Sequence, residues 1–102
     1  MKPRRVVVLP NTELDYIGHL AYLDEQRPGL AKRFEAEFLR AIVHLRTDAL
    51  WPFWDEERAL RLMPMGRPWE KYGLFFSVTD EEVQIRAIFH LVRRVKRHLR
   101  DR

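Results

Sequence analysis

The stretch that decides the fold of this chain is Tyr72-Gly73-Leu74-Phe75-Phe76-Ser77-Val78, followed by Val83-Gln84-Ile85-Arg86-Ala87-Ile88-Phe89. Two runs rich in aromatic and β-branched residues, separated by the polar residues 79–82, predict a β-hairpin. The second run leads directly into His90-Leu91-Val92-Arg93-Arg94. The last strand of the hairpin therefore ends at a histidine that is followed by arginines. Such side chains would make a surface suited to phosphate groups.

Two helices and a first strand are predicted ahead of this hairpin. Residues 4–9 form a β-branched run that ends at Pro10, because proline has no N–H for a sheet ladder. A first helix is expected over 13–26, with Thr12 and Asp15 close to a capping box. Its apolar stripe is expected to consist of Leu14, Ile17 and Ala21, with Leu20 beside them.

The second helix follows a break at Pro28-Gly29, where proline suits the first position of a new helix. It is expected to be longer than the first and antiparallel to it, because the connection is tight. A single apolar stripe marks its buried side: Leu30, Phe34, Phe38, Ala41, Ile42 and Leu45.

Residues 50–57 break this periodicity and place three aromatic residues beside a proline, which predicts a loop. The aromatic residues could form a stacking platform for bases or a hydrophobic lid over the core edge, and we favour the lid. A strand over 58–63 and a turn at 66–69 then complete a three-stranded meander with the hairpin. The expected fold is α+β: an N-terminal strand, an antiparallel helical hairpin and a three-stranded antiparallel meander, in one sheet and one domain (1–102).

The composition indicates the charge of a partner but not its identity. Lys and Arg number 19 against 15 Asp and Glu, for a formal net charge of +4. Basic residues crowd a tail that begins at about residue 93, which predicts a surface for nucleic acid or an acidic partner, or a solvated tail. The chain has no cysteine, hence no disulfide or thiolate metal site, and no apolar run long enough for a membrane span. We expect a soluble, cytoplasmic protein without a cofactor or metal.

Strand alternation predicts which side chains share a face. Val83, Ile85, Ala87 and Phe89 are expected under the helices, and Gln84, Arg86, Ile88 and His90 on the opposite face. On that uncovered face we expect a concave basic patch with some apolar ground, made by Phe75, Ser77, Arg86 and His90 with Arg61 nearby.

The order of these parts resembles the RelE/ParE superfamily of small bacterial toxins, and more closely its ParE branch. The stretches that carry the resemblance are Arg27–Phe34, Leu60–Arg67 and Ile85–Arg93. The resemblance implies a toxin encoded with an antitoxin whose tail folds across the helical hairpin and the sheet. ParE-like members act on DNA gyrase, whereas RelE-like members cut messenger RNA on the ribosome without metal.

The resemblance also implies candidate residues. A metal-free nuclease needs a base, an acid and cations for the phosphate, and the candidates for these roles are Arg61, Lys71, Arg86, His90 and Arg93. Target binding would use Arg61, Arg67, Arg86, His90, Arg93 and Arg94. The plainer alternatives are that His90 bonds a neighbouring carbonyl, and that Arg61 and Arg86 form ion pairs with Glu70, Glu81 or Glu82.

The sequence differs from both family patterns at several positions, and these differences decide the order in which we place the possible functions. Gly73 stands where RelE-like proteins often have an arginine after the tyrosine, and no tyrosine follows Arg93. Leu91 and Arg94 stand where ParE-like proteins commonly have a glycine and an acid. We therefore place a ParE-like toxin modestly above a RelE-like nuclease, with a non-toxic module that only binds an antitoxin as the third possibility.

Overall fold

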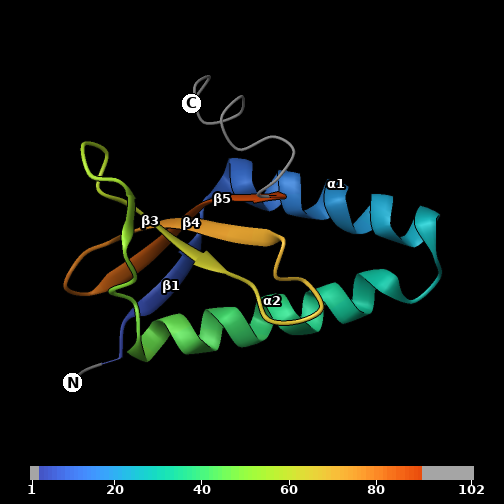
Figure 1. Ribbon diagram of the computed structural model, residues 1–102, viewed down its shortest axis with the longest axis horizontal. Coiled ribbons are helices and arrows are strands. Elements are labelled where there is room, and N and C mark those ends of the chain that lie inside the picture. Colours follow the sequence, from blue (N-terminus) through green and yellow to red (C-terminus); the bar gives the residue numbers. More distant parts are fainter. Residues whose placement is uncertain (1–2, 91–102) are drawn as a thin grey trace.

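A computed structural model of the chain describes residues 3–90, and side chains over residues 3–88. Within these residues, two antiparallel helices pack on one five-stranded sheet whose strand order is β1-β5-β4-β3-β2 (Figure 1). The elements, in chain order, are β1 (Arg5–Val8), α1 (Pro10–Gln26), α2 (Leu30–Thr47), β2 (Phe53–Asp55), β3 (Leu60–Pro64), β4 (Tyr72–Val78) and β5 (Glu82–His90).

The sheet confirms the expected arrangement and adds one strand to it. β1 lies parallel to β5, with Val6 opposite Val83, and β3, β4 and β5 form the antiparallel meander. The prediction of a loop over 50–57 was wrong for its middle, because residues 53–55 form β2 at the edge of the sheet against β3. Three residues are too few for alternation to be visible in the sequence, although Phe53 and Trp54 favour strands.

Helix α1 begins three residues earlier than expected. Pro10 occupies the first turn, where its missing N–H costs nothing, and Leu9 precedes the helix without a side-chain cap. Thr12 is fully buried, and its hydroxyl donates to the Arg86 carbonyl at 2.5 Å instead of capping the helix. The polar residue that suggested a cap therefore ties α1 to β5.

The buried side of α1 is not the stripe that the sequence suggested. Leu14, Ile17 and Ala21 are exposed, whereas Tyr16, Leu20 and Leu23 pack into the core between the helices and the sheet. α1 carries apolar residues on two sides, and periodicity alone does not tell which side meets the sheet.

Helix α2 buries the predicted stripe, with Phe34 and Leu45 wholly inaccessible to solvent. It begins at Leu30 rather than at Pro28, because Gly29 precedes it with a φ of +86°, a left-handed conformation that glycine adopts without strain. α2 has 18 residues and α1 has 17, so α2 is the longer helix as expected, by one residue.

A β-bulge in β5 changes which side chains face the helices. Phe75 lies opposite Ala87 and Phe76 lies opposite Ile85, so Arg86 is an extra residue in β5. Val83 and Ile85 face the helices as predicted, but the alternation shifts after Arg86. Ile88 joins the core under the helices and Ala87 joins a small cluster on the other face, the reverse of the prediction for both.

The Phe34 side chain offers a test of the main core. Phe34 is 0% exposed, and its ring lies 5.1 Å from both the Trp69 and Tyr72 rings. We expect Phe34→Ala to lower the free energy of unfolding by about 3–5 kcal/mol, because it leaves a cavity among rigid rings. Leu39→Ala, on the exposed side of the same helix, should cost under about 0.5 kcal/mol in the same urea titration. Equal losses for both variants would contradict this description of the core.

Tyr16 offers a test of the packing between the helices. Its ring stacks on Phe38 at 4.3 Å, and its buried hydroxyl has no hydrogen-bond partner among the described residues. Burial, assisted by the Glu35 carboxylate, raises the pKa of Tyr16 to about 12.

The folded pKa of Tyr16 exceeds the unfolded value of 10.0, so its contribution to stability is complete below about pH 10 and is lost as the pH rises towards about 12. We expect Tyr16→Phe to lose less stability than the wild type across this window in urea titrations. Tyr22→Phe, at an exposed position of the same helix, should follow the wild type. A Tyr16→Phe variant that follows the wild type would refute the proposed origin of the alkaline loss.

Candidate functional site

The face of the sheet opposite the helices carries a continuous row of polar side chains. Arg5 Nη2 donates to Glu82 Oε2 at 2.9 Å, and Gln84 Nε2 donates to Glu82 Oε1 at 2.9 Å. Arg86 Nη2 donates to Gln84 Oε1 at 3.1 Å, and Arg86 Nε donates to Ser77 Oγ at 3.0 Å. This polar row, made of Arg5, Glu82, Gln84, Arg86 and Ser77, has a cation at each side of one carboxylate.

The hydrogen bonds of the row stabilise the ionised form of its one acid. The amide of Gln84 and the guanidinium of Arg5 both donate to Glu82 and hold the pKa of this carboxyl below its ordinary value. Two cations and one anion leave the row with a net positive charge. It is suited to hold an acidic surface in one orientation, because guanidinium groups donate in fixed directions.

The bulge places Arg86 in this row. Its carbonyl accepts from Thr12 on the helix side, while its side chain bonds to Ser77 and Gln84 in the row. An extra residue in one strand redirects its side chain, and the buried hydroxyl of Thr12 fixes where the extra residue lies. The expected proximity of Ser77 and Arg86 is thus present.

The apolar ground of the predicted patch is covered. Phe75 lies on this face but is 0% exposed, packed with Leu60, Leu62 and Ala87 in the small second cluster. The Trp54 ring meets Phe75 edge to face at 5.5 Å. The patch therefore presents polar side chains, and the expectation of an accessible Phe75 was wrong because β2 supplies a cover that the sequence did not reveal.

Arg61 does not belong to the polar row. It lies opposite Phe76 across β3 and β4, and cross-strand neighbours share a face, so Arg61 is on the helix side. Its Nη1 donates to the Trp51 carbonyl at 2.6 Å, and its guanidinium lies 4.0 Å from the centre of the Phe53 ring. Arg61 therefore holds the chain before β2 in place, and the prediction that it lies near Arg86 was wrong.

The other candidates lie apart from the row or outside the described side chains. Arg67 and Lys71 are exposed in the connection between β3 and β4. His90 is described only as the last residue of β5, opposite Tyr72, and Arg93 and Arg94 fall outside the described residues. Glu82 forms its ion pair with Arg5.

The aromatic residues before β3 divide between the two alternatives. Trp51 is half-buried against the main core, as a lid requires. Phe53 and Trp54 each keep more than a third of their surface exposed while contacting Arg61 and Phe75.

Metal and membrane signals are both missing from the described part of the chain. Among these residues no cluster of three histidine, cysteine or acidic side chains could hold a metal ion. Over the same range no helix is both long and apolar enough to cross a bilayer.

A second surface lies along the helical hairpin, where an antitoxin tail was expected to fold, and its α1 residues were expected to be buried. Leu14 and Ile17 on α1 are 68% and 56% exposed, and Leu39 and Val43 on α2 are 54% and 64% exposed. Each pair is spaced at three or four residues, so each forms a stripe along its helix.

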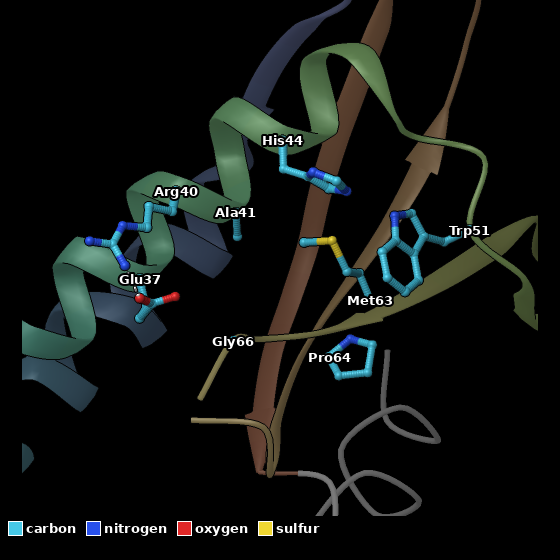
Figure 2. A pocket seen from close by; sticks show the side chains of 8 residues that line it. All are labelled: Glu37, Arg40, Ala41, His44, Trp51, Met63, Pro64 and Gly66. Carbon is cyan, nitrogen blue, oxygen red and sulfur yellow. Dashed lines mark hydrogen bonds and ion pairs between the residues drawn. The ribbon is translucent and has the colours of Figure 1, made fainter. Parts of the chain in front are cut away.

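The two stripes lie on the solvent side of the helical hairpin, and Ile17 and Leu39 are the members turned towards the partner helix. Seen from the β3 side of α2, where Glu37 and Arg40 lie, α1 is behind α2, so the opposite flank of α2 faces α1 (Figure 2). That flank begins one residue after the core position Phe38, at Leu39. In α1, Ile17 follows the core residue Tyr16 as Leu39 follows Phe38 in α2. Because the two helices are antiparallel on the same face of the sheet, Ile17 also lies on the side of its helix that faces the partner helix. We call Leu14, Ile17, Ala21, Leu39 and Val43 the hairpin groove.

Comparison with known proteins gives a fold but no sequence relative. No protein-family model matches the chain, and no curated protein matches it. Among solved structures, the chain resembles a chain from the chromosomal ParDE TA system of P. aeruginosa, with a TM-score of 0.73 and 15% sequence identity. The match covers 86% of this chain and 96% of that chain. The two chains share a fold, which confirms the α+β architecture expected from the RelE/ParE resemblance.

The bond from Thr12 to Arg86 can be tested by removing one hydroxyl. We expect Thr12→Val to lower the free energy of unfolding by about 1–3 kcal/mol, because the part-buried Arg86 carbonyl loses the donor that the buried Thr12 supplies. Thr12→Ser keeps the hydroxyl and should retain more of the stability. Amide hydrogen exchange at residues 85–87 should accelerate in Thr12→Val, and unchanged exchange there would show that the bond does not fix the bulge.

Proposed function

We propose that this protein is the toxin component of a type II toxin-antitoxin system, ParE-like in action, neutralised in the cytoplasm by an antitoxin encoded beside it. The observation that carries the proposal is the fold shared with a chain of the chromosomal ParDE TA system over 86% of this chain. One fold can serve several activities, so the surfaces of this chain supply the rest of the case.

The hairpin groove supports an antitoxin partner. Its four large side chains are each more than half exposed, an apolar surface that water solvates poorly. An amphipathic helix laid between α1 and α2 would bury them, at about 1.5–3 kcal/mol for each fully buried aliphatic side chain before the costs of association. We infer that a helical segment of the antitoxin occupies this groove.

A second contact is available at the edge of the sheet. Within residues 3–90, β1 is an outer strand whose one neighbour is β5, so its other edge presents backbone groups that no described strand pairs. An extended antitoxin segment that continues from the groove could add a strand there, with backbone hydrogen bonds for affinity.

Growth inhibition is proposed to come from binding a target such as DNA gyrase. The positions of Arg61 and Arg86 support this over RNA cleavage, since they occupy opposite faces of the sheet and bond to their own surroundings. A metal-free nuclease needs cations and an acid–base pair converging on one phosphate. The polar row, with Arg67, His90, Arg93 and Arg94, is the proposed target surface.

One observation favours the RelE-like alternative, which is that Arg86 lies on the open sheet face within a row of positive net charge. The two functions differ in what they do to transcripts. We would express the protein alone from a tight inducible promoter and follow growth, plasmid supercoiling and intact messenger RNA together. Arrest with altered supercoiling and whole transcripts is the expected result. Early transcript cleavage would replace the proposal with a ribonuclease, and normal growth would leave a non-toxic antitoxin-binding module.

The hairpin groove gives a prediction for the antitoxin. We expect Ile17→Glu and Leu39→Glu each to weaken the complex with the protein encoded beside this one by about tenfold or more, because a carboxylate would be buried among apolar groups. Leu50→Glu changes an equally exposed leucine outside the groove and should bind like the wild type. Binding would be measured by calorimetry on purified proteins, and undiminished affinity in both groove variants would exclude the groove as the antitoxin site.

A further inference from the structure

A cleft of about 230 Å³ lies between α2 and the end of β3, away from the hairpin groove and the polar row (Figure 2). Nothing in the proposed function uses it. We call it the α2–β3 cleft, and the residues that line it are Glu37, Arg40, Ala41, His44, Trp51, Met63, Pro64 and Gly66.

The cleft is elongated. Its α2 residues follow one side of the helix from Glu37 to His44, a span of two turns or about 10 Å. Ala41 and Met63 are buried between the two ends and form an apolar floor. The shape suits a short extended segment of polypeptide, in which side chains on one face repeat at about 7 Å.

Beyond Leu62, no described strand covers the edge of β3 beside the cleft, so this edge could take such a segment, although it resists a regular strand. β2 pairs only with Leu60 and Arg61, and the last contact is the Leu62 N–H donating to the Pro52 carbonyl. The Met65 N–H donates towards β4, so by alternation the carbonyl of Pro64 points away from β4. This edge offers an acceptor, while Pro64 has no N–H to offer.

One end of the cleft carries a carboxylate with one oxygen paired and the other open. The Glu37 side chain is 16% exposed, and its Oε1 accepts from Arg40 Nη1 at 2.6 Å, although Arg40 itself is 77% exposed. A Cβ at Gly66 would lie 2.8 Å from Glu37 Oε2, so glycine at this position gives the carboxylate its room. Oε2 has no hydrogen bond within residues 3–88. A carboxylate accepts up to about four hydrogen bonds, and this one has capacity left for a cation.

The other end is aromatic. The Trp51 ring is half-buried and lies 6.1 Å from the His44 ring, edge to face. His44 is bonded to Asp48 at 3.1 Å, near the C-terminal end of α2, where the helix dipole favours positive charge. In Figure 2 the Arg40 guanidinium lies at the far end of the cleft from Trp51. Arg40 therefore shares the Glu37 end, where it pairs with Oε1, and the Oε2 acceptor of Glu37 is the feature of the lining that selects a basic side chain over an acidic one.

We propose that the α2–β3 cleft binds an extended segment of a partner polypeptide that places a basic side chain at Glu37 and, two residues away, an apolar side chain against Met63 and Trp51. Charge complementarity selects the basic residue and the buried floor selects the apolar one. The site goes beyond the proposed function and does not depend on toxicity.

The test is a peptide titration of the full-length protein, in which binding is measured by changes in NMR chemical shifts and the charges of the peptide and of Glu37 are exchanged in turn. The probe is a capped alanine pentapeptide with arginine second and leucine fourth, and its matched control has glutamate in place of arginine. We expect saturable chemical-shift changes at Glu37, Ala41, Met63 and Trp51, with a dissociation constant on the order of 1 mM. The dissociation constant of the control peptide should be at least about tenfold higher.

Variants then assign the effect to one carboxylate. Glu37→Lys should reverse the preference, so that the glutamate peptide becomes the tighter ligand, and Glu37→Gln should reduce the difference between the two peptides. Glu35→Lys makes the same charge change on the other flank of α2 and should leave the preference intact. No saturable shifts at the cleft, equal binding of the two peptides, or a preference unchanged by Glu37→Lys would each overturn the proposal.

Discussion

The extra residue at Arg86 in β5 is the constraint on which the rest of the structure depends. It divides the strand into two halves of opposite alternation, so that Ile85 and Ile88 both face the helices. The hydroxyl of Thr12 holds the bulge by its bond to the Arg86 carbonyl, and thereby links the start of α1 to the centre of the sheet. A strand without the bulge would turn Ile88 out and Ala87 in, leaving a cavity under the helices.

The same constraint separates the two faces by chemistry. Under the helices lie rings and aliphatic side chains around Phe34 and Phe76, while the opposite face carries the polar row over a small second cluster. The helices are fully engaged with the sheet on one side only, so their outer sides are available to partners. The hairpin groove and the α2–β3 cleft lie on opposite flanks of α2, and their ligands would not compete directly.

The two surfaces of α2 differ in the kind of partner that they fit. The hairpin groove is lined by exposed aliphatic side chains, which gain most from burial against another apolar stripe. The cleft has less apolar area but a carboxylate held over Gly66, which confers selectivity for charge more than affinity.

The sequence by itself determined the order of both helices and of every described strand except β2, the buried stripe of α2 and the meander, because strong periodicity and turn residues act locally. The fold class and the pairing of Ser77 with Arg86 on one face also followed from it. Only the tertiary structure decided the buried side of α1, the strand at residues 53–55, the burial of Phe75 and the placement of Arg61. Each of these depends on contacts between residues far apart in the chain. Local pattern does not encode which of two apolar sides finds a partner, or where a strand takes up one extra residue.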